Sequence, residues 1–138
     1  MRSSRQEPRI VVVDDEDAVG ELMGFILRRA GYDASVVHDG KAGLALCDTA
    51  QPDLVITDIV MPDMEGIEFL RRLRQTRAGT PAIAMSGHPV GASFLEAARL
   101  LGAREVLQKP ISEATLLSAV RTVLTDAGGV PPEVGMAD

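Results

Sequence analysis

The chain has 138 residues, of which 46% are hydrophobic and only 3% aromatic, so it can form one domain with a core of aliphatic side chains. Its formal net charge of −6 argues against a general affinity for nucleic acid. The single cysteine, Cys47, excludes an intramolecular disulfide, and no apolar run approaches the roughly 20 residues of a membrane span. We therefore expect a soluble, cytoplasmic domain with no secretory signal and no membrane partner.

Five short segments are predicted to be strands, and two of them, residues 9–13 and 54–57, have the composition of strands buried on both faces of a sheet. The five segments are residues 9–13, 32–37, 54–57, 82–85 and 105–108. Helical spacing of apolar residues follows each of these segments. Regular alternation of this kind predicts a parallel sheet with helices on both faces.

Each predicted helix is assigned a buried face, or a range, from this spacing. The first helix, which ends at Gly31, has the face Val19, Leu22, Met23, Ile26 and Ala30, and the second has Ala42, Ala45, Leu46 and Thr49. The third helix covers about residues 67–75, and the fourth has the face Phe94, Ala97, Ala98 and Leu101. The last helix, with Ser112 as its N-cap, has the face Leu116, Val120, Val123 and Leu124.

The ends of the chain lack such patterns. Residues 1–8 are polar and are predicted to form a flexible arm. Residues 126–138 have no periodicity and are predicted to form a disordered tail or a linker. The folded domain is therefore expected to comprise residues 9–125.

Four of the predicted strands end next to a side chain suited to chemistry, namely Asp14 and Asp15, Asp58, Ser86 and Lys109. In a parallel sheet these ends meet at one edge, where ligands bind. Three carboxylates in a small space repel one another unless a cation lies among them, and an all-oxygen cluster suits Mg²⁺. A neighbouring lysine can hold phosphate, so the set favours phosphoryl transfer to the Asp58 carboxylate.

Each of these residues also has an ordinary structural interpretation. Acidic residues after a strand, such as Asp14, are common at helix N-termini. Ser86 taken alone is typical of a turn, and Lys109 taken alone of an exposed surface. The chemical interpretation depends on finding all of them at successive strand ends.

Four segments carry a family resemblance: VVVDDED, LVITDIVMPDMEG, AMSG and LQKP. In this order the chain resembles the receiver domain of bacterial two-component response regulators, from about residue 9 to residue 124. The resemblance implies a flavodoxin-like (βα)5 three-layer sandwich with a parallel five-stranded sheet in the order 2-1-3-4-5. It is closest in kind to the stand-alone, chemotaxis-regulator type.

The resemblance also implies a role for individual residues. Asp58 is the expected phosphoacceptor, and Mg²⁺ is expected to be held by Asp14, Asp15 and Asp58 together with the backbone carbonyl of Val60. Lys109 is expected to pair with Asp58 at rest and with the phosphoryl group after transfer.

Two further features follow from the same resemblance. The Ser86 hydroxyl is expected to bind the phosphoryl group, and the bond between Lys109 and Pro110 is expected to be cis. Many receivers have Tyr or Phe three residues before this lysine, where the present chain has Val106. A switch that depends on an aromatic ring is therefore not expected here.

The function implied is a phosphoacceptor signalling switch, not an enzyme with an external substrate. Its expected partners are a histidine kinase or histidine phosphotransfer protein and a separate downstream effector, without direct binding of nucleic acid. The sequence leaves open whether the chain is a whole protein or the receiver of a longer one. Position 88 and position 60, two residues beyond Ser86 and Asp58, tune the phosphoryl lifetime in the family.

Three other functions compete with this hypothesis. A phosphatase of the haloacid-dehalogenase kind uses Asp-x-Asp, but Val60 stands where the second Asp is needed. A dinucleotide-binding fold lacks its G-x-G-x-x-G after the first strand. An unphosphorylated scaffold would not require the complete acid, Ser and Lys set.

A few remaining residues are assigned ordinary roles. Cys47 and His38 have no metal-like neighbours in the sequence and are interpreted as structural or exposed. Arg71, Arg72, Arg74 and Arg77 crowd the end of a predicted helix, where cations are favourable, and a docking role for an acidic partner is the alternative.

Overall fold

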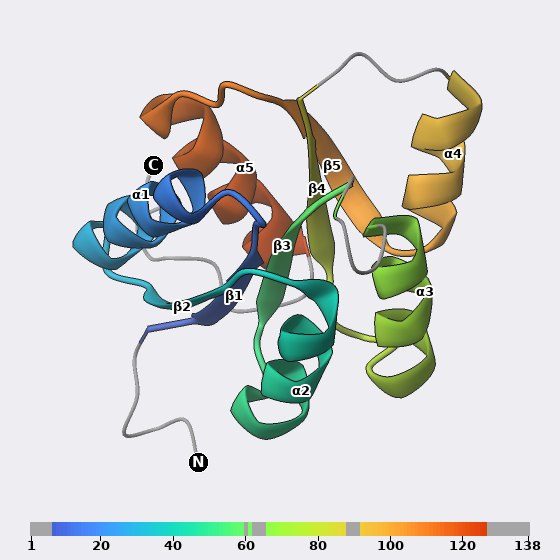
Figure 1. Cartoon of the computed structure of the whole chain (residues 1–138). Helices are drawn as coiled ribbons and strands as arrows, with labels where there is room; N and C mark the ends of the chain where they lie inside the picture. Colours follow the sequence, from blue (N-terminus) through green and yellow to red (C-terminus); the bar gives the residue numbers. More distant parts are fainter. Residues whose placement is uncertain (1–6, 60, 62–65, 88–91, 127–138) are drawn as a thin grey trace.

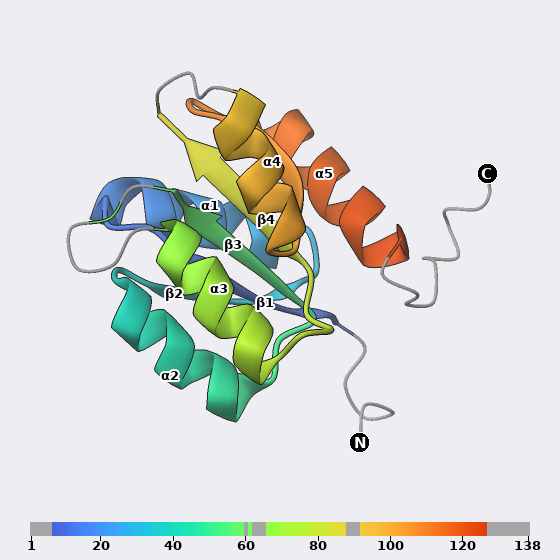
Figure 2. The ribbon, with the colours of Figure 1, turned by 90° about the vertical axis from the view of Figure 1, so that its right-hand side faces the viewer.

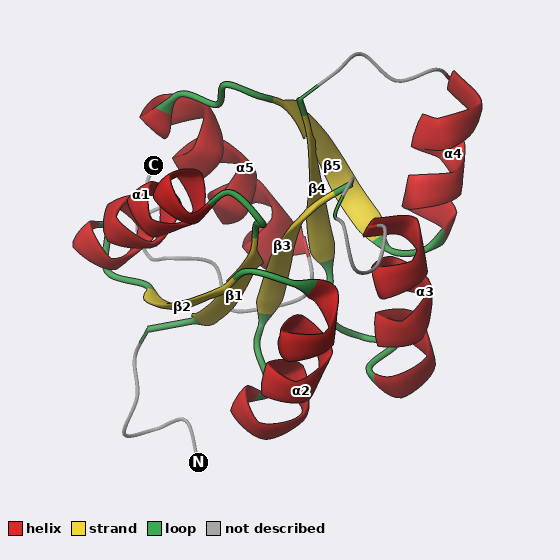
Figure 3. Ribbon diagram, in the orientation of Figure 1, coloured by secondary structure: helices red, strands yellow, loops and turns green. Residues whose placement is uncertain are grey.

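Strands and helices alternate along the chain in the computed structural model, which describes residues 7–59, 61, 66–87 and 92–126. The strands are β1 (Arg9–Val13), β2 (Asp33–Val37), β3 (Leu54–Asp58), β4 (Ala82–Ser86) and β5 (Ala103–Gln108). The helices are α1 (Asp17–Arg29), α2 (Gly40–Ala50), α3 (Gly66–Thr76), α4 (Ala92–Leu100) and α5 (Glu113–Asp126). Figure 3 shows this alternation by element type.

The strands form one parallel sheet in the order β2-β1-β3-β4-β5 (Figure 1). Helices α1 and α5 cover one face of the sheet, and α2, α3 and α4 cover the other (Figures 1 and 2). The flavodoxin-like (βα)5 sandwich with strand order 2-1-3-4-5 is thereby confirmed.

Each central strand is buried on both faces because alternate side chains enter opposite layers. Ile10 and Val12 of β1 pack with α1 and α5, whereas Val11 and Val13 pack with α2 and α3. On the second side Phe69 of α3 is completely buried against this layer. The continuous apolar runs in the sequence are therefore a consequence of burial on both faces of these strands.

The predicted face of α1 is partly wrong. Leu22 is 59% exposed and Ala30 is exposed, whereas Gly20, Met23, Gly24 and Leu27 are buried. The reason is a close helix–strand approach at Gly24, where an added Cβ would lie 2.7 Å from Cγ2 of Val36. Gly20 and Gly24 thus lie on the side of α1 that faces the sheet, and the larger apolar side chain of Leu22 faces the solvent.

The predicted face of α2 is also partly wrong, although Ala42 and Leu46 are half-buried as expected and Leu46 packs against the core. Ala45 and Thr49 are exposed, and the buried residues are Gly40, Gly43 and Cys47. A Cβ at Gly43 would lie 2.8 Å from Cγ2 of Val13, so this glycine again allows the helix to lie close to the sheet. The spacing of apolar residues does not identify a glycine as a residue that contacts the sheet.

The last helix agrees with its predicted face: Leu116, Val120 and Val123 are buried, and Leu124 is half-buried. Its N-cap is also confirmed, because the Ser112 hydroxyl accepts a hydrogen bond of 3.1 Å from the Thr115 amide. In α4, Ala98 is buried and Ala97 half-buried, and Phe94 lies outside the described side chains.

Element boundaries differ slightly from those predicted. β2 begins at Asp33 instead of residue 32, β5 begins at Ala103 instead of residue 105, and β4 includes Ser86. α5 continues to Asp126, while residues 1–6 of the predicted arm and 127–138 of the predicted tail lie outside the described residues. Within the described part of the chain, the helices are all too short or too polar to cross a membrane.

Candidate functional site

The carboxyl ends of four strands bring the predicted side chains to one edge of the sheet. Asp14 follows β1, Asp58 ends β3 and Ser86 ends β4, while Lys109 follows β5. The registers Val13 with Thr57, Asp58 with Met85 and Ser86 with Gln108 align these ends. Residues far apart in the sequence therefore meet as predicted.

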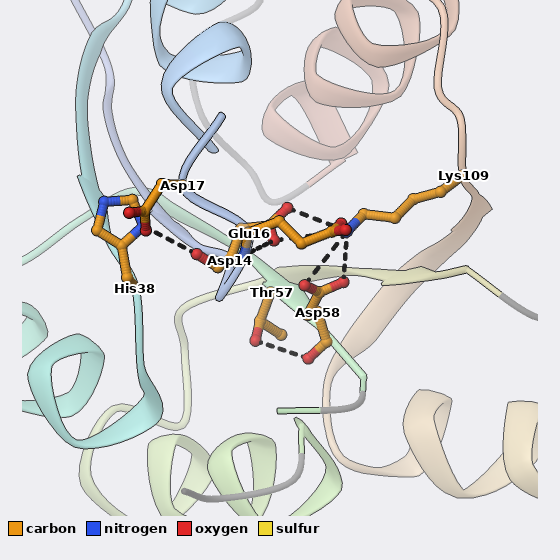
Figure 4. Close-up of polar contacts among 7 residues, drawn as sticks. All are labelled: Asp14, Glu16, Asp17, His38, Thr57, Asp58 and Lys109. Atoms are coloured by element: carbon orange, nitrogen blue, oxygen red, sulfur yellow. Dashed lines mark hydrogen bonds and ion pairs between the residues drawn. The ribbon is translucent and has the colours of Figure 1, made fainter. Parts of the chain in front are cut away.

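The ammonium group of Lys109 contacts three acidic side chains at this edge (Figure 4). Its Nζ lies 3.1 Å from Asp58 Oδ1, 3.2 Å from Asp14 Oδ2 and 2.9 Å from Glu16 Oε1. The side chain of Lys109 is only 13% exposed, and its amide donates a 2.7 Å hydrogen bond to the Ser86 carbonyl. The expected pairing of Lys109 with Asp58 is therefore present, and the Lys109–Pro110 bond is cis.

The charges of the site are unevenly balanced. Burial, together with the neighbouring Asp14, raises the pKa of Asp58 to about 8, and Lys109 only partly opposes this. Burial disfavours the charge on Lys109, but hydrogen bonds to Glu16 and Asp58 outweigh it and raise its pKa. Because Glu16 and Asp14 also face the ammonium group, Lys109 stays charged whether or not Asp58 is ionised.

The acid cluster has the chemistry of a site for a hard divalent cation. One carboxylate oxygen from each of Asp14, Asp15 and Asp58 lies within 4.8 Å of the others. Asp14 is fully buried, and among the described residues its Oδ2 has no hydrogen-bond donor, although the Lys109 ammonium lies at ion-pair distance. A buried carboxylate oxygen left in this state is costly, and the all-oxygen donor set suits Mg²⁺.

The backbone around these acids is held by local hydrogen bonds. The Asp14 amide donates to the Val37 carbonyl at 3.1 Å, and Asp14 Oδ1 accepts from the Glu16 amide at 2.9 Å. The Thr57 hydroxyl donates to the Asp58 carbonyl at 3.0 Å. Local hydrogen bonds therefore connect both residues to the sheet edge.

Ser86 is 6% exposed and lies at the end of the strand beside Asp58. Val106 is half-buried on β5 and packs with a cluster that includes Ala82, Ala84 and Ala98. Val60 and His88, to which the sequence assigned a metal-binding carbonyl and a tuning position, lie outside the described residues.

Two residues of this edge were not predicted as part of the site. Glu16 makes the shortest of the Lys109 contacts, and its place in the acidic run after β1 could have suggested it. His38 Nδ1 lies 3.0 Å from the Asp14 carbonyl, and this hydrogen bond, followed by the Asp17 and Glu21 charges, raises the pKa of His38. His38 directly follows β2, so the strand pattern did carry a signal for it.

The other residues singled out in the sequence lie away from this edge. Cys47 is buried in α2, and burial raises its thiol pKa to about 11. Glu68 binds both Arg71 and Arg72, at 2.6 and 2.7 Å, and these hydrogen bonds lower the pKa of Glu68 to about 2. Arg77 contacts the Pro52 carbonyl, so three members of the predicted basic cluster have partners inside the chain.

Comparison with known proteins agrees with this geometry. Residues 10–121 match the family described as response regulator receiver domain. The chain is 34% identical over 118 residues to the transcriptional regulatory protein TrcR of Mycobacterium tuberculosis, covering 84% of this chain and 45% of that protein. It is 32% identical over 117 residues to the alkaline phosphatase synthesis transcriptional regulatory protein PhoP of Bacillus subtilis, covering 84% and 48%.

Among solved structures, a CheY-like response regulator receiver domain protein of Methanospirillum hungatei superposes with a TM-score of 0.84 at 28% identity. That superposition covers 89% of this chain and 98% of the other. By contrast, the chain spans about half the length of the curated relatives it matches. The similarity to those longer proteins therefore concerns one part of each.

Proposed function

The chain belongs to the response regulator receiver domain family and acts as a phosphoacceptor signalling switch of a two-component system, and we propose that Asp58 receives the phosphoryl group. The observation that supports this assignment is the convergence of Lys109 on Asp58 and Asp14 at the carboxyl edge of the sheet. Asp58 is the carboxylate of this set that belongs to the central strand β3.

In the transfer step an Asp58 carboxylate oxygen attacks phosphorus, and the bond from phosphorus to the donor's leaving atom breaks. The electron pair of that bond leaves with the donor, a histidine side chain or acetate. Lys109 carries a positive charge within reach of Asp58, so it can offset charge on the transferring oxygens. Mg²⁺, when bound, would supply a further positive charge to the phosphoryl oxygens.

The residues proposed to hold Mg²⁺ are Asp14, Asp15 and Asp58 through their carboxylates and Val60 through its backbone carbonyl. The close approach of the three carboxylates supports this set. Mg²⁺ commonly takes few protein ligands and keeps several waters, so a small open set is sufficient.

The switch itself is proposed to involve Ser86 and Lys109. A phosphoryl group adds about 1.5 to 2 negative charges and strong acceptor oxygens, so both side chains would be drawn to it. Val106 offers no ring to reorient, so the change would pass through the backbone after β4 instead of an aromatic side chain.

The proposed partners are a histidine kinase or a histidine phosphotransfer protein as donor and a separate effector protein as receiver of the signal. The module would promote only its own phosphorylation and dephosphorylation, in the cytoplasm, without direct contact to nucleic acid or membrane. Arg74 and its neighbours on α3 remain a candidate docking surface for an acidic partner.

Phosphate-affinity electrophoresis after incubation with acetyl phosphate and Mg²⁺ tests the assignment. The wild type should give a slower band that is absent with EDTA and absent in Asp58→Ala. Asp48→Ala is the matched control, because Asp48 is an exposed aspartate on α2 and should be phosphorylated like the wild type. A slower band that persists in Asp58→Ala would place the phosphoryl group elsewhere.

A further inference from the structure

The backbone of Asp14 is held from two sides by consecutive residues at the end of β2. Its amide donates to the carbonyl of Val37 at 3.1 Å. Its carbonyl lies 3.0 Å from Nδ1 of His38, and because a carbonyl oxygen can only accept, Nδ1 must be the donor. The peptide unit that joins Asp14 to Asp15 is therefore oriented by His38.

The other polar contacts of His38 are weaker. Its Nδ1 lies 3.3 Å from Asp17 and its Nε2 3.4 Å from Glu21, but the side chains of these acids are 83% and 60% exposed. Exposed ion pairs of this kind contribute little. The contact with the Asp14 carbonyl is thus the one that ties His38 to the acid cluster, as Figure 4 shows.

Helix α1 lies beside the ring, and a glycine stands at the facing position. A Cβ at Gly20 would lie 3.6 Å from Cε1 of His38 and 3.4 Å from Cβ of Asp14. Helix α1 therefore lies directly against both residues at a position without a side chain. The imidazole is 36% exposed and lies beside α1 and the Asp14 carbonyl.

From this geometry we propose that His38 is a positioning residue for the metal site: it fixes the Asp14–Asp15 peptide unit and so sets the spacing of the two carboxylates for Mg²⁺. This role rests on the proposed function of the site. It belongs to a residue outside the acid, Ser and Lys set that the sequence motifs contain. Residues that orient metal ligands typically contribute about 10-fold or more to metal affinity.

The direction in which replacement of His38 changes the Mg²⁺ affinity distinguishes a positioning role from a purely electrostatic one. A protonated His38 near the acids would repel a divalent cation, so removal of that charge alone should tighten Mg²⁺ binding. Loss of positioning should weaken it. His38→Leu is accordingly expected to weaken Mg²⁺ binding by about 10-fold, as measured by calorimetric titration.

Two neutral amides provide a matched comparison. The side-chain NH₂ of Asn can occupy the place of Nδ1 and donate to the Asp14 carbonyl, whereas that of Gln reaches toward the place of Nε2 and Glu21. His38→Asn should therefore bind Mg²⁺ within about 3-fold of the wild type, and His38→Gln about 10-fold more weakly. Unfolding of each variant in EDTA, measured in parallel, separates this effect from a general loss of stability.

Equal or tighter Mg²⁺ binding by His38→Gln, or equal weakening in the Asn and Gln variants, would overturn the proposal. A second readout without metal is the amide NMR signal of Asp15, because this amide shares a peptide unit with the Asp14 carbonyl that accepts the His38 hydrogen bond. That signal should move in the Gln variant and stay near its wild-type position in the Asn variant. If the wild type bound no Mg²⁺, the proposed metal site and the role of His38 in it would both fail, while this signal would still show whether His38 orients the Asp14–Asp15 peptide unit.

Discussion

At the scale of single residues, the site is defined by an excess of negative charge at buried positions. Asp14 and Asp58 are 0% and 5% exposed and share the ammonium group of Lys109 with Glu16. One ammonium group cannot fully balance two buried carboxylates, and Glu16 adds a third negative charge at an exposed position. This excess of negative charge favours binding of a divalent cation, and it makes the stability of the folded protein depend on pH.

The pH dependence follows from the raised pKa of Asp58, about 8 in the folded chain against about 3.9 in an unfolded one. Between these values the folded state binds one more proton than the unfolded state. The free energy of unfolding should therefore fall as the pH rises from about 4 to about 8 in the absence of Mg²⁺.

Asp58→Asn removes this titration and is expected to stabilise the metal-free protein at pH 8 by about 1 to 3 kcal/mol, with a smaller gain at pH 5. The gain stays below the full value of the pKa shift because the amide also gives up an ion pair with Lys109. Denaturant unfolding of both proteins in EDTA measures the difference. A gain that did not grow with pH would contradict the raised pKa.

Cys47 is a reactive group that burial in the core makes unreactive. It is 1% exposed, and burial raises its thiol pKa to about 11. Reaction with a thiol reagent at pH 8 should be at least about 100-fold slower in the native protein than in guanidinium chloride, because little thiolate forms and access is blocked. Equal rates in the two conditions would show that α2 opens readily.

At the scale of elements, burial of strands was predictable and the orientation of helices was less so. Most positions of β1 and β3 are apolar because both faces of these strands are covered, and this composition is visible in residues 10–13 and 54–56. In α1 and α2 the contact lines pass through Gly24 and Gly43. Glycine adds no hydrophobic signal, so the spacing of larger residues pointed to Leu22 and Ala45 instead.

The capping of helix ends could be predicted from the sequence only in part. The Ser112 cap was predicted because Ser accepts hydrogen bonds from free amides, and Asp39 does the same for Ala42 at 2.7 Å. The left-handed residue at the end of α2 is Gln51, with φ of 50°, and nothing in a glutamine predicts this conformation.

The start of α3 is pressed against the strand that carries Asp58. A Cβ at Gly66 would overlap the Asp58 carbonyl, and the Gly66 amide donates to the Ile59 carbonyl at 2.6 Å. Gly66→Ala should therefore destabilise the protein by about 1 to 3 kcal/mol, since backbone must move to make room. Denaturant unfolding measures this change.

Gly79→Ala is the matched control, because an added Cβ there meets nothing within 4 Å. It should be neutral or slightly stabilising, by up to about 1 kcal/mol, through the entropy of the unfolded chain. Equal destabilisation by both substitutions would contradict the close approach of α3 to β3.

At the scale of the whole molecule, the sheet edge collects side chains that are far apart in the sequence. Lys109 and Glu16 are separated by 93 residues and meet at 2.9 Å. The strand-end positions of Asp14, Asp58, Ser86 and Lys109 were predictable, since parallel strands share one carboxyl edge. Glu16, in the acidic run after β1, and His38, directly after β2, are placed by the strand pattern at this same edge. Their individual contacts could not be predicted, because these depend on side-chain directions in loops that no periodic pattern describes.

The account depends most on one claim: that Asp58, the neighbouring acids and Lys109 together accept a phosphoryl group and alter the edge of the sheet. Beryllofluoride with Mg²⁺, a stand-in for that group, tests this by amide NMR on the wild type and on Asp58→Asn. In the wild type the signals of Asp58, Ser86 and Gly87 should shift, and in Asp58→Asn they should stay in place. Unchanged wild-type signals with saturating beryllofluoride and Mg²⁺ would contradict the account.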